Sequence, residues 1–455
     1  MKHMSTGHIH HSFFQNTISI SVKGLSHRSS IDYSLTRMSH WFHRNPLKST
    51  KVAKFELKTV VTNGEASKIC SELRLRREQF IDLIRNTSTS DLELVESEFE
   101  QYLRLLHGFV YDVNNPEKNS KLRYLGKFVW TNTLTGADAY ISADSWFEVL
   151  SMCVNMAIFY MKKAAFISAK DEVREVDAKQ IHTALRKAAG IFVFVLKNRE
   201  KVGVIPSAPC NDLDERILNA YQSQCIAEAQ EVTIARAIEL KHSPKLISNL
   251  ANETANLYAK CDKFLENFDA SNVEKWRKYF QLKSKFYQSY AFSYLCEHLL
   301  TEDKCGQAIR ACTEGNRCYK ESSDLCSLYA KAQGPGFIAK PECHLFFRRI
   351  GPILNRHMEK AQRENSFIYH EKVPDECPAL EGETEYGLAK PIDFNYPTKS
   401  DLWDLPTYQE AFDITKAGEV DFHQPSKKGK IALIKESPTY ETDKDPMNLS
   451  GCVIS

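Results

Sequence analysis

The sequence lacks the short motifs that most directly indicate an enzyme or a metal centre. None of its 455 residues form a GxxxxGKS/T phosphate loop, a GxSxG elbow, an HExxH pair or a strand–GxGxxG–helix unit. The 13 cysteines include no CxxC pair, and the closest three, Cys305, Cys312 and Cys318, are seven and six residues apart. We therefore expect no catalytic residues, no metal and no cofactor. A helical binding protein is the favoured class, and an unrecognised enzyme is the less favoured alternative.

A strong charge of one sign and a long apolar run are also missing. The formal net charge is +2, which gives no electrostatic reason to expect a nucleic-acid partner. There is no run of eighteen apolar residues and no secretory signal, so we expect a protein of the reducing cytoplasm whose membrane attachment, if any, is peripheral. The apolar fraction of 42% is ample for a folded core.

Composition divides the chain into three parts. Residues 1–37 are rich in Ser and His and are expected to be a disordered extension, or the product of an upstream start site. Residues 38–415 are expected to fold. From 416 to 455 Lys, Glu, Asp and Pro replace the aromatics, which predicts a flexible tail. Three histidines of the extension offer metal ligands, although disorder is the favoured interpretation: His8, His10 and His11.

Apolar periodicity predicts a mostly α fold. Two β-like runs are expected at 52–61 and 123–131. Asp212 and Glu215 fit a capping box, and Ser243-Pro244 fits an N-cap followed by proline at the first helical position. The Trp276 to Ala332 stretch suggests a tetratricopeptide-like hairpin, and the aromatic, proline-containing stretch after Gln362 suggests an extended arm on the helices. The expected helices are 65–86, 91–113, 143–167, 174–199, 212–241, 244–267, 273–302, 304–332 and 343–363.

The helix expected at 244–267 has an apolar arc wider than one packing partner needs. One stripe includes Ile247 and Tyr258, and a second, displaced by roughly 80°, includes Leu246 and Leu250. The pattern alone favours a helix that packs between two neighbours. The alternative is a groove in which Leu246 and Leu250 accept an amphipathic helix from another protein, with Arg236 as a cationic edge.

Eight segments of the chain carry a family resemblance. They are MSHWFHRNPLK (38–48), SKICSEL (67–73), SKLRYLGKFVWTNTL (120–134), AEAQEVTIARAIELKHSP (227–244), KWRKY (275–279), DKCGQAIR (303–310), HLFFRRIG (344–351) and QRENSFIYHEKVP (362–374). With them the chain resembles the Bro-domain family of Alix-related adaptors. The resemblance implies a banana-shaped, mostly α domain with a tetratricopeptide-like helical core, a small N-terminal β-element and an extended C-terminal arm. It also implies binding to the C-terminal amphipathic helix of a CHMP-type ESCRT-III subunit, at endosomal or nuclear-envelope membranes.

By position, the patch that binds this helix in the family corresponds here to Leu246, Leu250 and Arg236. An aromatic residue of the family patch is replaced by Thr233, which implies one weaker apolar contact. Tyr369 matches a tyrosine that is phosphorylated in Alix, so the resemblance makes it a possible phosphorylation site; a ring packed in the arm is the alternative.

The chain ends in GCVIS, a cysteine followed by two aliphatic residues and a serine. Such an ending directs farnesyltransferase to the cysteine, here Cys452, with Val453, Ile454 and Ser455 as the recognition residues. One prenyl chain gives only marginal anchoring, and the lysines of 427–430 are a weak second signal. We therefore expect a farnesyl tether that cooperates with the bound helix, and a soluble, unlipidated scaffold is the alternative.

Overall fold

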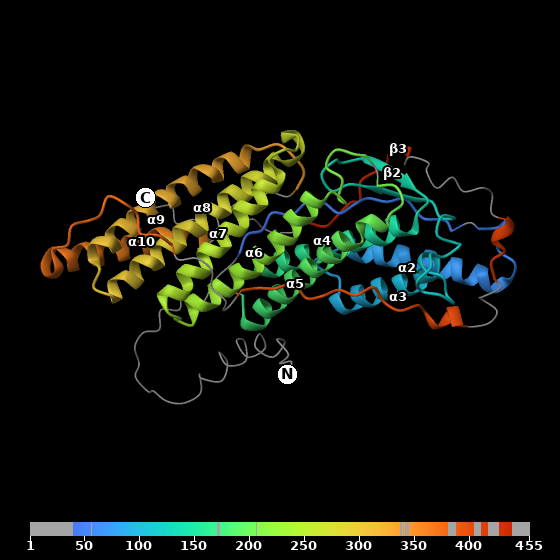
Figure 1. Ribbon diagram of the computed structural model, residues 1–455, viewed down its shortest axis with the longest axis horizontal. Coiled ribbons are helices and arrows are strands. Elements are labelled where there is room, and N and C mark those ends of the chain that lie inside the picture. Colours follow the sequence, from blue (N-terminus) through green and yellow to red (C-terminus); the bar gives the residue numbers. More distant parts are fainter. Residues whose placement is uncertain are drawn as a thin grey trace, which may run out of the picture.

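The computed structural model describes an elongated stack of helices (Figure 1). The first two helices and a small sheet lie at one end, and the last helices lie at the other. The described residues are 40–438, except for 56, 171–172, 206, 337–338, 340, 342–344, 381–387, 405–410 and 417–426.

Helices that follow one another in the chain pack side by side from α4 to α10, which is the arrangement expected of a tetratricopeptide-like core. Every predicted helix is confirmed, with ends shifted by only a few residues, because apolar periodicity and capping signals agree along this part of the chain. Their bounds are α2 (Gly64–Arg85), α3 (Leu92–Val110), α4 (Ser145–Ser168), α5 (Glu175–Asn198), α6 (Glu215–Glu239), α7 (Pro244–Leu265), α8 (Ala270–Thr301), α9 (Cys305–Lys331) and α10 (Leu345–Glu364).

Helix α4 is the most apolar of the stack. Its length and mean hydropathy of 1.3 would suit a membrane-spanning segment, but 89% of that window is buried inside the protein. Its buried Asn155 has partners in the interior: the side chain accepts a hydrogen bond from the Lys48 amide and donates one to the Lys48 carbonyl. The composition of α4 is therefore that of a core helix enclosed by other elements.

The β-element is a three-stranded antiparallel sheet in the order β1-β2-β3. Its strands are β1 (Phe128–Thr131), β2 (Asp138–Ser142) and β3 (Lys427–Lys430). The run at 123–131 is confirmed as a strand in its second half. The predicted strand at 52–61 is wrong: the described residues there form only an isolated bridge, Val61 to Phe412, because the chain turns at 58–60 and Phe55 packs into the core against Phe109 and Phe128 without strand pairing.

The predicted helix caps are half right. Ser243 caps α7 with Pro244 at the first position, as expected. Asp214, not Asp212, caps α6 by accepting from the Arg216 amide at 2.9 Å. The Asp212 carboxylate is instead fully buried, where it accepts from Thr133 and pairs with Lys48 at 3.1 Å. Because the Asp212 carboxylate pairs with a buried lysine from a distant part of the chain, it does not cap α6.

Two extended segments hold the helices together. The N-terminal segment, 40–50, is mostly buried, and the Arg44 guanidinium forms a two-point ion pair with Glu228 of α6. The arm predicted after Gln362 is confirmed in its described part. It approaches α5 so closely that a Cβ on Gly190 would lie 1.7 Å from the Ile392 carbonyl oxygen, and only glycine fits there.

Part of the tail predicted to be flexible is docked on the folded domain. β3 pairs with β2, and the chain then runs back to the turn between α2 and α3. There the Ser437 amide donates to the Arg85 carbonyl at 2.9 Å. The Glu436 side chain is only 8% exposed and pairs with Lys162 of α4 at 2.7 Å. The flexible-tail prediction is therefore wrong for residues 427–438.

Candidate functional site

The turn between α6 and α7 is sharp and well defined. Lys241 has a left-handed backbone, with a φ of 54°, and the amides of Lys241 and His242 donate back to the carbonyls of Ile238 and Ala237. This is the Schellman pattern, which satisfies carbonyls that the end of a helix leaves unpaired. A lysine in the position usually taken by glycine costs roughly 1 kcal/mol, so the turn is stabilised by its surroundings. Leu240, at the end of α6, is 40% exposed beside this turn.

The two patch leucines differ in accessibility. Leu246, in the first turn of α7, is partly buried and packs against the edge of the core, which leaves part of its side chain for a partner. Leu250, one turn later, is 0% exposed. The expectation that both leucines line an open groove is therefore wrong for Leu250. Because α7 packs against α6 on one side and α8 on the other, the wide apolar arc serves two neighbours.

The other two predicted patch residues are also engaged within the protein. Thr233 is 4% exposed, and its hydroxyl donates to the Ala229 carbonyl at 3.4 Å, so it offers no direct contact. Arg236 is partly exposed but forms an ion pair with Glu239, and its second guanidinium nitrogen lies 3.9 Å from Glu175. The predicted cationic edge is therefore largely neutralised before any partner arrives.

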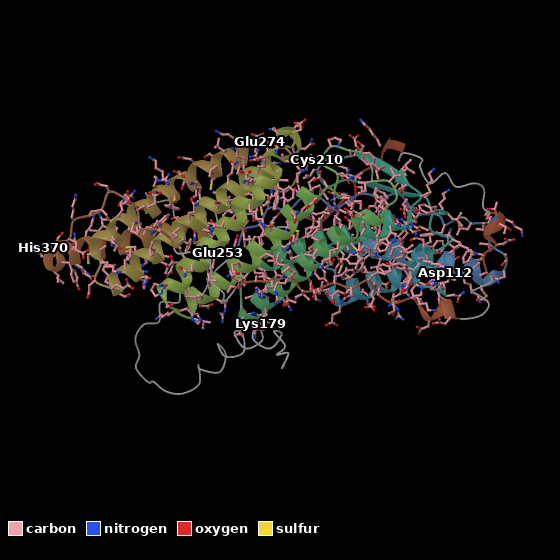
Figure 2. The ribbon with its side chains drawn as sticks, in the orientation of Figure 1. Asp112, Lys179, Cys210, Glu253, Glu274 and His370 are labelled. Atoms are coloured by element: carbon pink, nitrogen blue, oxygen red, sulfur yellow. The ribbon has the colours of Figure 1, made fainter. Side chains whose placement is uncertain are left out.

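Tyr369 belongs to the π-helical turn η4 (Asn365–Tyr369) that follows α10, and its neighbour His370 is labelled at one end of the molecule in Figure 2. Its side chain is 37% exposed, and its hydroxyl donates to the Asp303 carboxylate. This hydrogen bond raises the pKa of Tyr369 to about 12, because the neighbouring carboxylate disfavours the phenolate. The ring is accessible enough for the predicted modification, which stays a prediction.

The predicted lipidation residues, Cys452 and the recognition triplet Val453, Ile454 and Ser455, lie outside the described residues, as do the histidines of 1–37. The structure does define the point from which this end of the chain departs. Ser437 is hydrogen-bonded to the α2–α3 turn, and Cys452 is 15 positions further along the chain. At about 3.3–3.6 Å per residue, Cys452 can reach at most roughly 50 Å from that turn.

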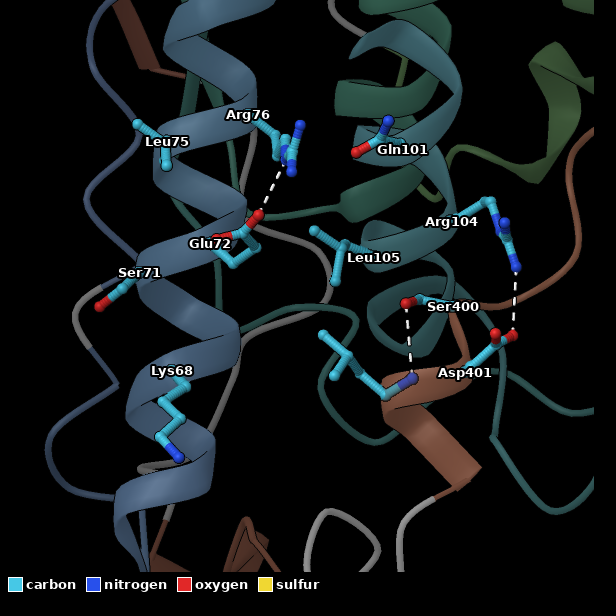
Figure 3. A pocket seen from close by; sticks show the side chains of 11 residues that line it. Lys68, Ser71, Glu72, Leu75, Arg76, Gln101, Arg104, Leu105, Ser400 and Asp401 are labelled. Atoms are coloured by element: carbon cyan, nitrogen blue, oxygen red, sulfur yellow. Dashed lines mark hydrogen bonds and ion pairs between the residues drawn. The ribbon is translucent and has the colours of Figure 1, made fainter. Parts of the chain in front are cut away.

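A hollow of about 680 Å³ lies between α2, α3 and the turn η5 (Asp401–Asp404) of the arm (Figure 3). Its basic residues are paired with acids: Arg76 with Glu72 at 2.8 Å, and Arg104 with Asp401 at 3.2 Å. The residues that line it include no histidine and no cysteine. The hollow is thus lined by three basic and two acidic side chains, without a nucleophile held beside a base.

A second hollow, of about 480 Å³, lies where the arm crosses α3, α4 and α5. Phe99, Leu103 and Phe394 are among its apolar residues. At its edge the Glu96 carboxylate accepts from the Tyr160 hydroxyl and from Lys187, both at 2.7 Å.

Buried thiols account for most cysteines of the described chain. Burial raises the pKa values of Cys153, Cys225 and Cys261, which keeps these thiols protonated and unreactive. No group of three or more His, Cys, Asp or Glu side chains suited to a metal ion occurs among the residues that the structure describes.

Two features of the surface were missed by the sequence reasoning. Leu240 adds apolar area beside Leu246, and its signal was an apolar residue in the last turn of a helix directly before the polar KHS turn. The docking of Glu436 on Lys162 has no local signal, since the two residues are far apart in the chain.

The comparisons with known proteins agree with this architecture. Residues 46–413 match the family model described as "BRO1-like domain". The chain is 47% identical over 429 residues to the "BRO1 domain-containing protein BROX homolog" of Caenorhabditis elegans. The match covers 92% of this chain and 100% of the relative. It is 44% identical over 384 residues to "BRO1 domain-containing protein BROX" of Homo sapiens, covering 84% and 93% respectively.

Solved structures share the fold at low sequence identity. A crystal structure of ALIX in complex with the SIVmac239 PYKEVTEDL late domain matches with a TM-score of 0.62 and 17% identity. The match covers 80% of this chain but only 51% of the ALIX chain, so this chain spans about half the length of that protein. The "ALIX BRO1 CHMP4C complex" matches with a TM-score of 0.59 and 18% identity over 81% of this chain and 99% of the other. The chain thus belongs to the BRO1-domain family, and its similar relatives include the BROX proteins.

Proposed function

We propose that this protein is an ESCRT adaptor that binds the C-terminal amphipathic helix of a CHMP-type ESCRT-III subunit at the α6–α7 turn. The observation that carries the proposal is the partly exposed side chain of Leu246, at the position of the family's patch leucine, with Leu240 exposed nearby. Family membership and the fold shared with the ALIX–CHMP4C complex support it.

The burial of the neighbouring residues changes how the contact would work. Leu250 and Thr233 support the surface from beneath, and Leu246 supplies the contact itself. Burying one leucine side chain contributes about 1.5–3 kcal/mol before the costs of association. Such a contact is weak and reversible, and it suits an adaptor that gains strength from a membrane held by a second attachment.

A titration of the full-length protein with a synthetic CHMP-type C-terminal helix tests the binding site. Leu246→Asp places a charge in the apolar contact and should weaken binding at least tenfold. Leu94→Asp is the matched control, because Leu94 is 47% exposed on α3, far along the stack from α7. Both variants should melt like the parent. Parent-like binding by Leu246→Asp would overturn the site.

We further propose that Cys452 is farnesylated and tethers the adaptor to endosomal or nuclear-envelope membranes. The cysteine thiolate would displace diphosphate from farnesyl diphosphate on farnesyltransferase, forming a thioether and releasing a proton from the thiol. The thioether adds an apolar chain worth about 0.8 kcal/mol per buried CH₂. The intact mass of protein from its native cells should show the prenyl group and loss of the last three residues, and Cys452→Ser should move the folded protein to the soluble fraction. If the C-terminus of the protein from its native cells were unmodified, the alternative of a soluble, unlipidated scaffold would be correct.

A further inference from the structure

An exposed apolar cluster lies at the end of the molecule beyond α10. Phe367 is 79% exposed and Ile368 is 65% exposed, which are the two highest values among the large apolar side chains of the described residues. Tyr369 and Val373, at 37% and 38%, extend the cluster, which we call the apolar tip. Single exposed apolar residues are ordinary, but four within seven residues mark a candidate interaction site.

The backbone of the apolar tip is held in place by hydrogen bonds. The Asn365 side chain both donates to the Glu371 carbonyl, at 2.9 Å, and accepts from the Glu371 amide, at 2.8 Å. The His370 amide donates to the Asn365 carbonyl at 2.7 Å, and the Glu371 carboxylate accepts from the Gly306 amide at 2.7 Å. The tip is therefore ordered before any partner binds, so binding costs little further entropy.

The apolar tip protrudes, and this limits what it can contact. His370 is labelled at the extreme end of the long axis in Figure 2. A protein partner would have to supply a pocket for a protrusion, whereas a bilayer accepts an exposed aromatic and aliphatic pair without a matching shape. The neighbouring charges are mixed: Lys360 lies 3.9 Å from Glu364, while Arg363 and Lys372 are offset by acids such as Asp375. The tip thus offers no basic patch for anionic lipids.

We propose that the apolar tip is a membrane-insertion site, with Phe367 and Ile368 entering the acyl boundary of a zwitterionic bilayer. The two side chains carry the binding and the hydrogen-bonded turn orients them. The site supplies a second membrane contact at the end of the stack beyond α10, away from the α2–α3 turn, where the C-terminal segment is docked beside α4. It requires neither the prenyl group nor the bound helix, so it can be tested without either.

Flotation of unprenylated full-length protein with small phosphatidylcholine vesicles tests the proposal. The parent should float with the vesicles, and Phe367→Asp/Ile368→Asp should lower the vesicle-bound partition coefficient about a hundredfold or more, since each side chain contributes roughly tenfold or more. Val176→Asp is the matched control, because Val176 is 63% exposed at the start of α5 and should float like the parent. Adding phosphatidylserine or salt should change little.

Three results would overturn the proposal: no flotation of the parent, equal flotation of the double variant, or flotation that requires phosphatidylserine. The first result would favour a protein pocket as the partner of the apolar tip. The double variant should bind the CHMP-type helix like the parent, so loss of vesicle binding with intact helix binding separates this proposal from the proposed function. A Phe367→Trp variant gives an independent readout, because its emission should shift to the blue on adding vesicles.

Discussion

Glu228 and Glu231, one turn apart on α6, are fully buried, and each carboxylate is shared by several side chains. Glu228 accepts from Arg44, Gln224 and Tyr279. Glu231 accepts from Lys283 at 2.9 Å and from Tyr258. A buried charge is tolerated when its hydrogen bonds are satisfied in this way, so these glutamates fix the N-terminal segment and α8 relative to α6.

His43, in the same segment, predicts a pH dependence of stability. Its ring lies 2.9 Å from the Tyr329 hydroxyl and 3.1 Å from the Asn45 side-chain oxygen, and burial lowers its pKa to about 3. In the unfolded chain its pKa is about 6.5, so below that pH the unfolded state binds a proton that the folded state does not. The free energy of unfolding should therefore fall by up to about 1.4 kcal/mol per pH unit between pH 6.5 and 3 from this residue alone.

Urea unfolding of the parent and of His43→Gln at several pH values checks this. The variant lacks the titrating ring, so its free energy of unfolding should fall less steeply between pH 6.5 and 4.5, even if it is lower at pH 7. Equal slopes for the two proteins would show that His43 does not contribute the dependence.

From the sequence one can predict whether a position is apolar or polar, but not which residues its side chain contacts. The arc containing Leu246 and Leu250 was correctly identified as apolar, but periodicity cannot distinguish a side chain at the rim of the packed region from one a turn deeper. Asp212 shows the same limit: its spacing to Glu215 fits a cap, yet a buried lysine and a threonine from elsewhere in the chain bind it more strongly.

At the scale of elements, helices were predictable because their signals are local. Strands were only partly predictable, since a four-residue strand is defined by its neighbour: β3 is a lysine-rich segment with no apolar alternation, and it pairs through its backbone with Asp138–Ile141. Lysines are usual on an edge strand, where they discourage pairing with another chain. Composition alone predicts a flexible tail, although the backbone of β3 completes the sheet.

The docked tail segment depends on the pair between Glu436 and Lys162. Glu436 lies 2.7 Å from Lys162, which is 1% exposed, and burial lowers the pKa of Lys162 while the Glu436 carboxylate opposes that shift. Glu436→Gln should lower the free energy of unfolding by about 3 kcal/mol, because it removes one charge of a buried pair. It should also speed tryptic cleavage within Lys427–Lys430.

The double variant Glu436→Gln/Lys162→Met serves as the control for that prediction. It removes both charges and should recover part of the lost free energy of unfolding, as expected for coupled residues. If Glu436→Gln matched the parent in its rate of tryptic cleavage and its free energy of unfolding, the pair would not be what holds the tail on the domain.

At the scale of the whole molecule, the three proposed contacts are spread along the stack of helices. The prenylated tail would leave from beside the α2–α3 turn, the helix-binding surface would lie at the α6–α7 turn, and the apolar tip lies beyond α10. Each contact would be weak by itself, but contacts on one molecule raise the effective concentration of the others. The stack was predictable from sequence and resemblance, whereas the spacing of the contacts required the structure.

Amide hydrogen exchange of the full-length protein, with and without a saturating CHMP-type C-terminal helix, tests the central claim most directly. If the α6–α7 turn is the binding surface, amides of 238–250 should exchange several-fold more slowly when the helix is bound, and those of 392–398 in the arm should be unchanged. Protection confined to the arm and α3, or found nowhere in α6 and α7, would contradict the account.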